Sequence, residues 1–340
     1  MQIRIPRPCL TFVLIVAVVT PVWSQSLTDE GVRRSISRGV DFIKSQQNKR
    51  SGSWNGYLDY PEGLTSLATL ALLNAGEDVR SPAIQRALDQ IREVGKPRKV
   101  YSTALRTMAL CAAEPAKSRV IIEENVRWLE QVQAKTGQYS GAWGYHNESR
   151  PDNSNSQFAL LALYEAQRIG VQVDPNVWKR SQTHFRSSIR ANGAWAYFEH
   201  PAAPMPATGS MTCAAVCSLV ICNEALRYQG VDDQDEVRCC GDSDEDAAVQ
   251  RGLKWLGRFP MSGNPGSGSF LMYFLYGIER TGRLTGQRFL GDHDWYREGT
   301  SFLLGRQDSL NGFWKGTGPM EQDPVVSTSF ALLFLAKGRR

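Results

Sequence analysis

The chain has 340 residues, of which 42% are hydrophobic, 21% charged and 10% aromatic. This composition is typical of a packed globular protein and excludes a fibrous or largely disordered chain. The formal net charge is +5 and the basic residues are scattered rather than gathered in a stripe, so the sequence predicts no binding of nucleic acid.

The first 24 residues have the pattern of a secretory signal peptide. Arg4 and Arg7 precede an apolar stretch at residues 10–20. We therefore expect export to the periplasm or the cell exterior, and one domain over residues 25–340 that does not require membrane association. An uncleaved anchor is the alternative, although the apolar stretch is shorter than the roughly 20 residues that span a bilayer.

Helical patterns follow in six pairs, and the two members of a pair differ. The first member has one apolar and one charged face, as in residues 38–43, 125–129, 251–256 and 298–303. The second member is apolar nearly all the way round, which requires burial on most sides. These second helices are predicted at residues 64–73, 101–112, 158–166, 212–220, 270–278 and 325–335. The alternation predicts an all-α (α/α)6 toroid with inner and outer rings of six helices each.

Capping residues support these boundaries. Ser81, Asp174 and Asp323 each stand directly before a proline, which is favoured at the first helical position. Every inner helix also begins with a hydroxyl cluster, such as Thr65 with Ser66. Such hydroxyls satisfy free backbone N–H groups, and a ring of helix N-termini would carry positive potential. The sequence therefore favours an anionic group on a ligand.

Four repeats carry a glycine and, two residues later, a tryptophan between the two helices. The tryptophans are Trp54, Trp143, Trp195 and Trp314. Gln47 and Gln307 stand five residues before the glycine in the first and last of these repeats. The arrangement resembles the QW motif of squalene and oxidosqualene cyclases and the matching repeat of protein prenyltransferase β subunits. The resemblance implies the terpenoid cyclase and prenyltransferase toroid, in which these glutamines and tryptophans tie neighbouring helices together.

The catalytic signatures of that group are missing from the sequence. The Asp-x-Asp-Asp acid motif of the cyclases is not found, and neither is the Asp/Cys/His zinc set of the prenyltransferases. The nearest acidic strings, residues 232–236 and 242–246, are predicted as a solvated loop. We therefore predict no cofactor and no metal centre, with a loosely held divalent cation at that loop as the alternative.

Five cysteines crowd into one region of the chain. They are Cys213, Cys217, Cys222, Cys239 and Cys240. In an exported chain a disulfide from Cys222 to Cys239 or Cys240 is one possible pairing, whereas Cys213 and Cys217 are predicted as core residues of an apolar helix.

The outer-to-inner connections must all emerge at one end of a toroid, so their polar side chains converge on one mouth. The side chains proposed for general acid/base catalysis are His146, His200, Glu199 and Asp59. Those proposed for ligand binding are Tyr57, Tyr60, Tyr145, Tyr197, Lys315 and Asp323. The alternative is that the histidines cap helix ends or face water.

Three functions stay open at this stage. The first is an exported toroid that binds an apolar or anionic small molecule or lipid in a central cavity lined by inner-helix aromatics such as Phe158 and Tyr273, without established catalysis. The second is an isoprenoid cyclase or transferase with non-standard acid residues. The third is a polysaccharide lyase or hydrolase that acts on a glycan. The sequence leaves the oligomeric state open.

Overall fold

The computed structural model describes residues 28–55, 61–147, 149–199, 202, 204–230 and 246–336. Over these ranges the chain forms twelve α-helices and one short hairpin, which confirms the all-α class. The odd-numbered helices are α1 (Asp29–Gln46), α3 (Pro82–Glu93), α5 (Arg119–Val132), α7 (Pro175–Ser187), α9 (Ala247–Leu256) and α11 (Trp295–Arg306). The even-numbered helices are α2 (Pro61–Ala75), α4 (Val100–Ala113), α6 (Asn153–Arg168), α8 (Gly209–Tyr228), α10 (Leu271–Leu284) and α12 (Pro324–Leu335).

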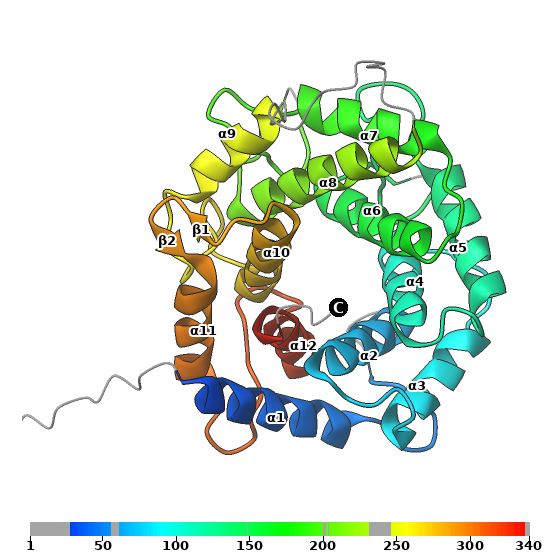
Figure 1. Cartoon of the computed structure of the whole chain (residues 1–340), viewed down its shortest axis with the longest axis vertical. Helices are drawn as coiled ribbons and strands as arrows, with labels where there is room; N and C mark the ends of the chain where they lie inside the picture. The colour runs from blue at the N-terminus through cyan, green and yellow to red at the C-terminus, as the bar shows by residue number, and fades with distance from the viewer. Residues whose placement is uncertain are drawn as a thin grey trace, which may run out of the picture.

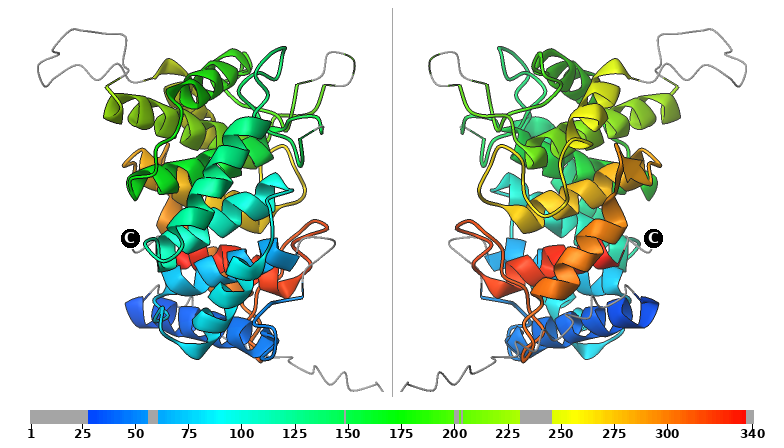
Figure 2. Two further views of the ribbon diagram at one scale, coloured as in Figure 1. Left: turned by 90° about the vertical axis from the view of Figure 1, so that its right-hand side faces the viewer. Right: turned by 90° about the vertical axis from the view of Figure 1, so that its left-hand side faces the viewer.

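The helices form two concentric rings (Figure 1). Each even-numbered helix packs against the next, and α12 packs against α2 to close the inner ring. The odd-numbered helices surround it, and β1 (Phe289–Leu290) pairs antiparallel with β2 (His293–Asp294) between α10 and α11. The predicted (α/α)6 toroid is therefore confirmed. Figure 2 shows that the long outer-to-inner connections extend from one end of the rings, which we call the loop end.

Burial explains why the inner helices are apolar on all sides. Helix α8 is long and apolar enough to cross a membrane, yet 83% of its apolar window is buried inside the protein. Three of the predicted helix starts are confirmed, at Pro82, Pro175 and Pro324. Asp174 caps its helix by accepting the Asn176 N–H at 2.9 Å, whereas the Ser81 hydroxyl makes no capping bond.

The four tryptophans of the outer-to-inner connections join the two rings in the same way. Each is buried and donates its indole N–H to a carbonyl of the preceding outer helix, as Trp143 does to Leu129 at 2.7 Å. Each backbone N–H of these tryptophans is bonded to a hydroxyl of the following inner helix, here Ser156 at 2.9 Å. The equivalent pairs are Trp54 with Thr65, Trp195 with Thr212, and Trp314 with Thr328. Part of the hydroxyl cluster at the inner helix starts therefore holds the connections in place.

Glutamines at the ends of two outer helices link each of these helices to the next outer helix. Gln47 donates to the carbonyls of Gly52 and Ala83, and Gln307 donates to those of Ser35 and Gly312. Because Ser35 lies on α1, the second set joins the last outer helix to the first and closes the outer ring.

Gln133 makes a third linkage of this kind that the sequence spacing did not reveal. It donates to Gly141, Val177 and Ser181, and its own carbonyl accepts the Arg180 guanidinium at 2.8 Å. It stands eight residues before its glycine rather than five, because the connection after α5 is longer than the one after α1.

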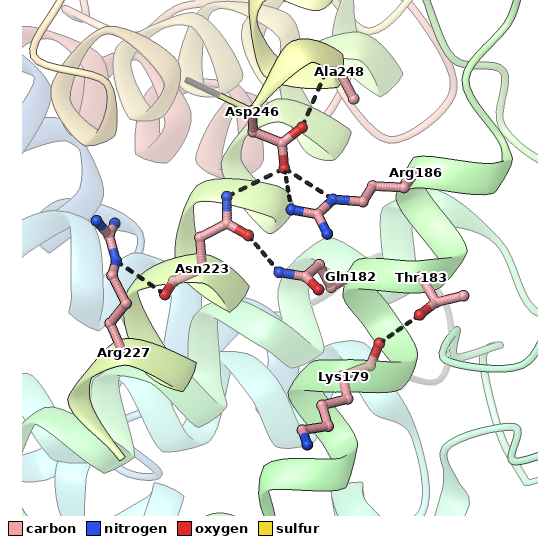
Figure 3. A network of polar contacts seen from close by, with 8 residues as sticks. All are labelled: Lys179, Gln182, Thr183, Arg186, Asn223, Arg227, Asp246 and Ala248. Atoms are coloured by element: carbon pink, nitrogen blue, oxygen red, sulfur yellow. Dashed lines mark hydrogen bonds and ion pairs between the residues drawn. The ribbon is translucent and has the colours of Figure 1, made fainter. Parts of the chain in front are cut away.

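Helix α9 begins directly after residues 231–245 and is fixed at its first turn. Asp246 caps the helix through the Ala248 N–H at 3.0 Å and pairs with Arg186 of α7 at 2.9 Å (Figure 3). Asn223 of α8 donates to the same carboxylate and accepts from Gln182. Three helices therefore converge on one carboxylate. The rest of the two predicted acidic strings, with Cys239 and Cys240, lies outside the described residues.

Candidate functional site

A pocket of about 310 Å³ opens at the loop end between the α5–α6 and α7–α8 connections. Its lining residues are Gln138, Tyr139, Pro151, Asp152, Asn153, His184, Ser188, Phe198, Glu199 and Pro204. Three of them, Asp152, Asn153 and His184, are polar yet only 4%, 3% and 8% exposed. Aromatic and proline side chains form much of the remaining wall. A concave site with a few buried polar groups among apolar ones is typical of small-molecule pockets.

Asp152 is positioned by both secondary structure and capping. Its backbone pairs with Trp143 in a short antiparallel bridge, and its side chain caps α6 by accepting the Asn155 N–H at 2.8 Å. Burial raises the pKa of its carboxyl from 3.8 to about 6, although hydrogen bonds from Asn155, Tyr197 and Ser154 act in the opposite direction. Asp152 therefore changes its charge near pH 6.

Asn153 holds the two sides of the pocket together. Its amide donates to the carbonyl of Ala196 at 2.8 Å, and its backbone N–H donates to the Tyr197 carbonyl at 2.9 Å. The carbonyl oxygen of its side chain lies 3.0 Å from His184 Nε2, which comes from the end of α7. Burial lowers the pKa of His184 to about 4, so its ring is neutral at physiological pH.

A chain of hydroxyl groups runs beside the pocket toward the centre of the toroid. The Tyr197 hydroxyl hydrogen-bonds with the Asp152 carboxylate and lies 3.1 Å from the hydroxyl of Tyr145. On the inner helices, the hydroxyls of Tyr101 and Ser154 share a hydrogen bond, and Ser154 donates to the Tyr273 hydroxyl at 3.1 Å. Burial raises the pKa of Tyr101, Tyr197 and Tyr273, so these three hydroxyls stay protonated.

Aromatic rings fill part of the space enclosed by the inner helices. Phe158 of α6 stacks on Tyr273 of α10 with ring centroids 6.0 Å apart, and on Tyr276 at 6.2 Å. Phe330 of α12 meets the same two tyrosines at 5.9 and 5.5 Å. Helices α6 and α10 are separated by α8 in the inner ring, so these contacts cross the interior. All four of these rings are buried.

The pocket offers acid–base chemistry and a bias against anions. A carboxyl with a pKa near 6 is mostly ionised at physiological pH and can accept a proton there, and perturbed groups of this kind are common in functional sites. The described lining includes the carboxylates of Asp152 and Glu199 but neither lysine nor arginine. Three of the inner-helix N-termini that favoured an anion are already occupied by the protein's own carboxylates. Asp152 caps α6, Asp323 caps α12, and Glu321 accepts the Tyr273 N–H of α10 at 2.7 Å.

The structure brings some of the predicted site residues together. Tyr145 and Tyr197 are in contact, and Tyr197 reaches Asp152. Glu199 lines the pocket, but its carboxylate forms a two-point ion pair with Arg190 at 2.9 and 2.8 Å. His146 lies on the same connection as Tyr145 with an exposed side chain, and its backbone is bonded to Ser149.

Other predicted residues lie apart from the pocket or outside the described chain. Lys315 is exposed, with its amine 5.6 Å from the Phe313 ring, and the Asp323 carboxylate accepts the Val325 N–H at 2.7 Å as a helix cap. Tyr57, Asp59, Tyr60 and His200 lie outside the described residues.

Asp152 and His184 line the candidate pocket and were not predicted from the sequence. Asp152 directly precedes the hydroxyl cluster of α6 and has the ordinary sequence signature of a helix cap. His184 stands on the amphipathic helix α7, where its spacing from Trp178 and Ser181 indicates only the buried face. Their shared pocket depends on a contact between separate repeats that single-sequence spacing does not encode.

No metal site is evident in the part of the chain that the structure describes, since it contains no cluster of three His, Cys, Asp or Glu side chains. The thiols of Cys111, Cys213, Cys217 and Cys222 are free and buried. Burial raises the pKa of Cys217 to about 12, so this thiol is unreactive at physiological pH.

The fold recurs in solved structures of several activities. Cellobiose 2-epimerase from Spirochaeta thermophila is 13% identical with a TM-score of 0.59, and the match covers 91% of this chain and 96% of that one. The type II terpene cyclase MstE from Scytonema, in complex with geranylgeranyl dihydroxybenzoate, is 12% identical with a TM-score of 0.58 over 91% and 97% of the two chains.

Protein geranylgeranyltransferase-I from Candida albicans, complexed with GGPP, is 14% identical with a TM-score of 0.56 over 92% and 90% of the two chains. No family model and no curated protein matches the sequence. The chain therefore has the α/α toroid fold of the terpene cyclases and prenyltransferases, and identities this low extend the likeness to the fold alone.

Proposed function

We propose that this protein binds a small, neutral, polyhydroxylated molecule, such as a sugar, in the loop-end pocket. The observation that carries the proposal is the set of three polar side chains, Asp152, Asn153 and His184, that are more than nine-tenths buried and yet line a pocket. Each of the three is hydrogen-bonded within the protein, Asp152 to Asn155, Asn153 to Ala196 and His184 to Asn153, so their positions are fixed. Polar groups fixed in a concave, partly apolar wall are those that orient a bound ligand with hydroxyl groups. A volume of about 310 Å³ suits one small ligand.

The walls of the pocket suit a sugar for a second reason. Tyr139 and Phe198 provide aromatic surface beside the polar groups, and sugar rings have apolar faces that pack on aromatic rings. Arg150 lies 3.6 Å from the centre of the Phe198 ring and covers one face of it, which holds the ring in place. The described lining holds no lysine or arginine that could pair with a phosphate, sulfate or carboxylate group.

A lipid or isoprenoid in the toroid centre is the second candidate. It is favoured by the continuous ring contacts from Tyr101 through Phe158 to Phe330 and by the prenyl ligands of two of the similar structures. Against it, the rings cross the interior, and a hydrocarbon would have to displace them.

Binding measured by ligand-observed NMR and calorimetry separates these candidates. The panel consists of D-glucose, D-mannose, inorganic phosphate and geranylgeraniol in detergent. We expect binding of a sugar and at least a tenfold loss in His184→Gln and in Phe198→Ala. The matched control is His293→Gln, because His293 is a half-buried histidine bonded to Glu298 away from the pocket.

The variants must keep the melting temperature of a folded protein for the comparison to count. Sugar affinity that is unchanged in both pocket variants, or binding of geranylgeraniol or phosphate in place of the sugars, would contradict the proposed function.

We further propose that the chain is exported, on the signal-peptide pattern of residues 1–24. An extracytoplasmic location would give such a protein access to sugars outside the cytoplasm.

A further inference from the structure

The ring of His184 uses one of its two nitrogens for a hydrogen bond within the protein. Nε2 lies 3.0 Å from the side-chain carbonyl oxygen of Asn153, whereas Nδ1 makes no hydrogen bond with the described residues. Nδ1 is not enclosed by the described residues either. Because His184 lines the pocket, this second nitrogen is open to a ligand there.

The hydrogen bonds of Asn153 determine which nitrogen of His184 carries the ring proton. The amide nitrogen of Asn153 donates to the Ala196 carbonyl at 2.8 Å, so its carbonyl oxygen faces His184. Exchanging these two atoms of Asn153 would place two carbonyl oxygens against each other. An oxygen of this kind only accepts, so Nε2 carries the proton and donates it. Nδ1 therefore keeps its lone pair and is a hydrogen-bond acceptor.

Burial keeps this acceptor unprotonated and in place. It lowers the pKa of His184 to about 4, so Nδ1 takes up no proton at physiological pH. The imidazole meets the Phe185 ring edge-on with ring centroids 5.1 Å apart, and the Phe185 carbonyl accepts the Trp195 indole N–H at 2.9 Å. An acceptor that is held rigidly before the ligand arrives loses little conformational entropy on binding.

The polar groups beside His184 do not supply a proton to Nδ1. Ser188 lines the same pocket one turn further along α7, but its hydroxyl makes no hydrogen bond with the described residues. The carboxylates of Asp152 and Glu199 accept hydrogen bonds from other parts of the protein. An acceptor without a donor in a partly apolar wall costs free energy. A ligand that brings a donor would remove this cost.

We propose that His184 Nδ1 selects the ligand of the pocket by accepting a hydrogen bond from one sugar hydroxyl, so that only sugars with a free hydroxyl at that position bind well. The inference rests on the proposed function and adds the direction of one hydrogen bond to it. A site built to bond one hydroxyl rejects analogues that lack it, because the protein's own buried group is then left without a partner.

Analogues that differ from the parent sugar in a single hydroxyl test this selection. The probes are the monodeoxy and monodeoxyfluoro analogues of D-glucose and of D-mannose, with affinities measured by calorimetry. Fluorine occupies much of the space of a hydroxyl but cannot donate a hydrogen bond. At one position of the sugar, we expect both the deoxy and the deoxyfluoro analogue to bind about 10-fold more weakly than the parent.

His184→Gln assigns the selected hydroxyl to Nδ1. Glutamine can donate to Asn153 in place of Nε2, but it has no acceptor in the place of Nδ1. This variant should bind the parent sugar about 10-fold more weakly and should no longer distinguish the parent from the two analogues, because both changes remove the same hydrogen bond. His293→Gln, the matched control, should keep the full difference between the parent and its analogues.

Nitrogen-15 NMR of the imidazole gives a readout that does not depend on a variant. In the unmodified protein the ring proton of His184 should be on Nε2, and the Nδ1 resonance should move when the tighter-binding sugar is added. A proton on Nδ1, or an Nδ1 resonance that stays in place when the pocket is saturated, would overturn the inference.

The outcomes separate the inference from the proposed function. Sugars that bind while every fluorinated analogue binds like its parent would overturn the role of Nδ1 and leave the pocket as the site. A difference between the parent and its analogues that persists in His184→Gln would overturn that role as well. Failure of both parent sugars to bind would contradict the proposed function itself, and the inference with it.

Discussion

Asp152 and His184 are predicted to give the stability of the protein two opposing dependences on pH. Burial raises the pKa of Asp152 from 3.8 to about 6, so the folded protein binds a proton there more tightly than the unfolded chain does. This contribution to stability is fully present below pH 4 and is lost as the pH rises through 6. Since one pKa unit corresponds to about 1.4 kcal/mol, the loss amounts to about 3 kcal/mol.

His184 acts in the opposite direction. Its pKa falls from 6.5 to about 4 on burial, so its contribution is present above pH 6.5 and is lost as the pH falls toward 4, again by about 3 kcal/mol. In the unmodified protein the two effects nearly cancel between pH 4 and 6.5. Removing one of the two titrating groups should therefore reveal the pH dependence of the unfolding free energy that the other group causes.

Asp152→Asn is the most informative single change. Asparagine is as good a helix cap as aspartate, and Asn155 can turn its amide to pair with it, because the Asn155 Oδ1 atom is buried without a partner. We expect a gain in unfolding free energy of up to about 3 kcal/mol at pH 7.5, and a steep loss on acidification from pH 6.5 to 4. His184→Gln should instead gain stability over that acidification.

Urea denaturation at pH 4.5, 5.5, 6.5 and 7.5 measures these slopes for the three proteins. Asp323→Asn is the matched control, because Asp323 caps α12 but is half-buried rather than buried. An unfolding free energy of Asp152→Asn that runs parallel to that of the unmodified protein over this pH range would contradict the opposing titrations of Asp152 and His184.

Three further predictions concern the scaffold and the leader. Gly141→Ala should lower the unfolding free energy by at least about 2 kcal/mol, because Gly141 has a φ of +93° and a Cβ there would collide with the Arg180 carbonyl; Gly137→Ala, with a φ of +75° and open space around it, should cost about 1 kcal/mol. Gln133→Ala should cost about 2–3 kcal/mol in chemical denaturation, because it removes three buried hydrogen bonds, whereas Gln131→Ala on the exposed side of α5 should be nearly neutral. Amino-terminal sequencing of the protein from an exported fraction should begin near Gln25, and an intact Met1 end would indicate an uncleaved anchor.

The fold was predictable because its signal is repeated. Six apolar helices alternate with six amphipathic ones, and glycine and tryptophan mark four of the connections. A helix that is apolar on all sides must be buried on all sides, so each of the six repeats indicates the same inner ring. The position of Phe270 differed from the prediction, since it was expected inside an apolar helix but precedes α10 in a left-handed conformation. The apolar side chain of Phe270 does not indicate a left-handed backbone, because that conformation depends on contacts with the α11–α12 connection.

The candidate site was only partly predictable. The loop end was correctly placed at the outer-to-inner connections, because this follows from the direction of the helix pairs. Acid/base catalysis was predicted for polar residues of the connections such as His146. In the sequence, Asp152 has the pattern of an ordinary helix cap and His184 that of an ordinary core residue. Their burial, and with it their altered pKa values, arises only when the α5–α6 and α7–α8 connections meet.

A crystal structure of the protein soaked with the tightest-binding sugar would locate the binding site. We expect a sugar ring between Phe198 and Tyr139, with hydroxyl groups within hydrogen-bonding distance of Asp152, Asn153 or His184. A ligand found instead in the toroid centre, among Phe158, Tyr276 and Phe330 with these rings displaced, would contradict the loop-end pocket as the binding site.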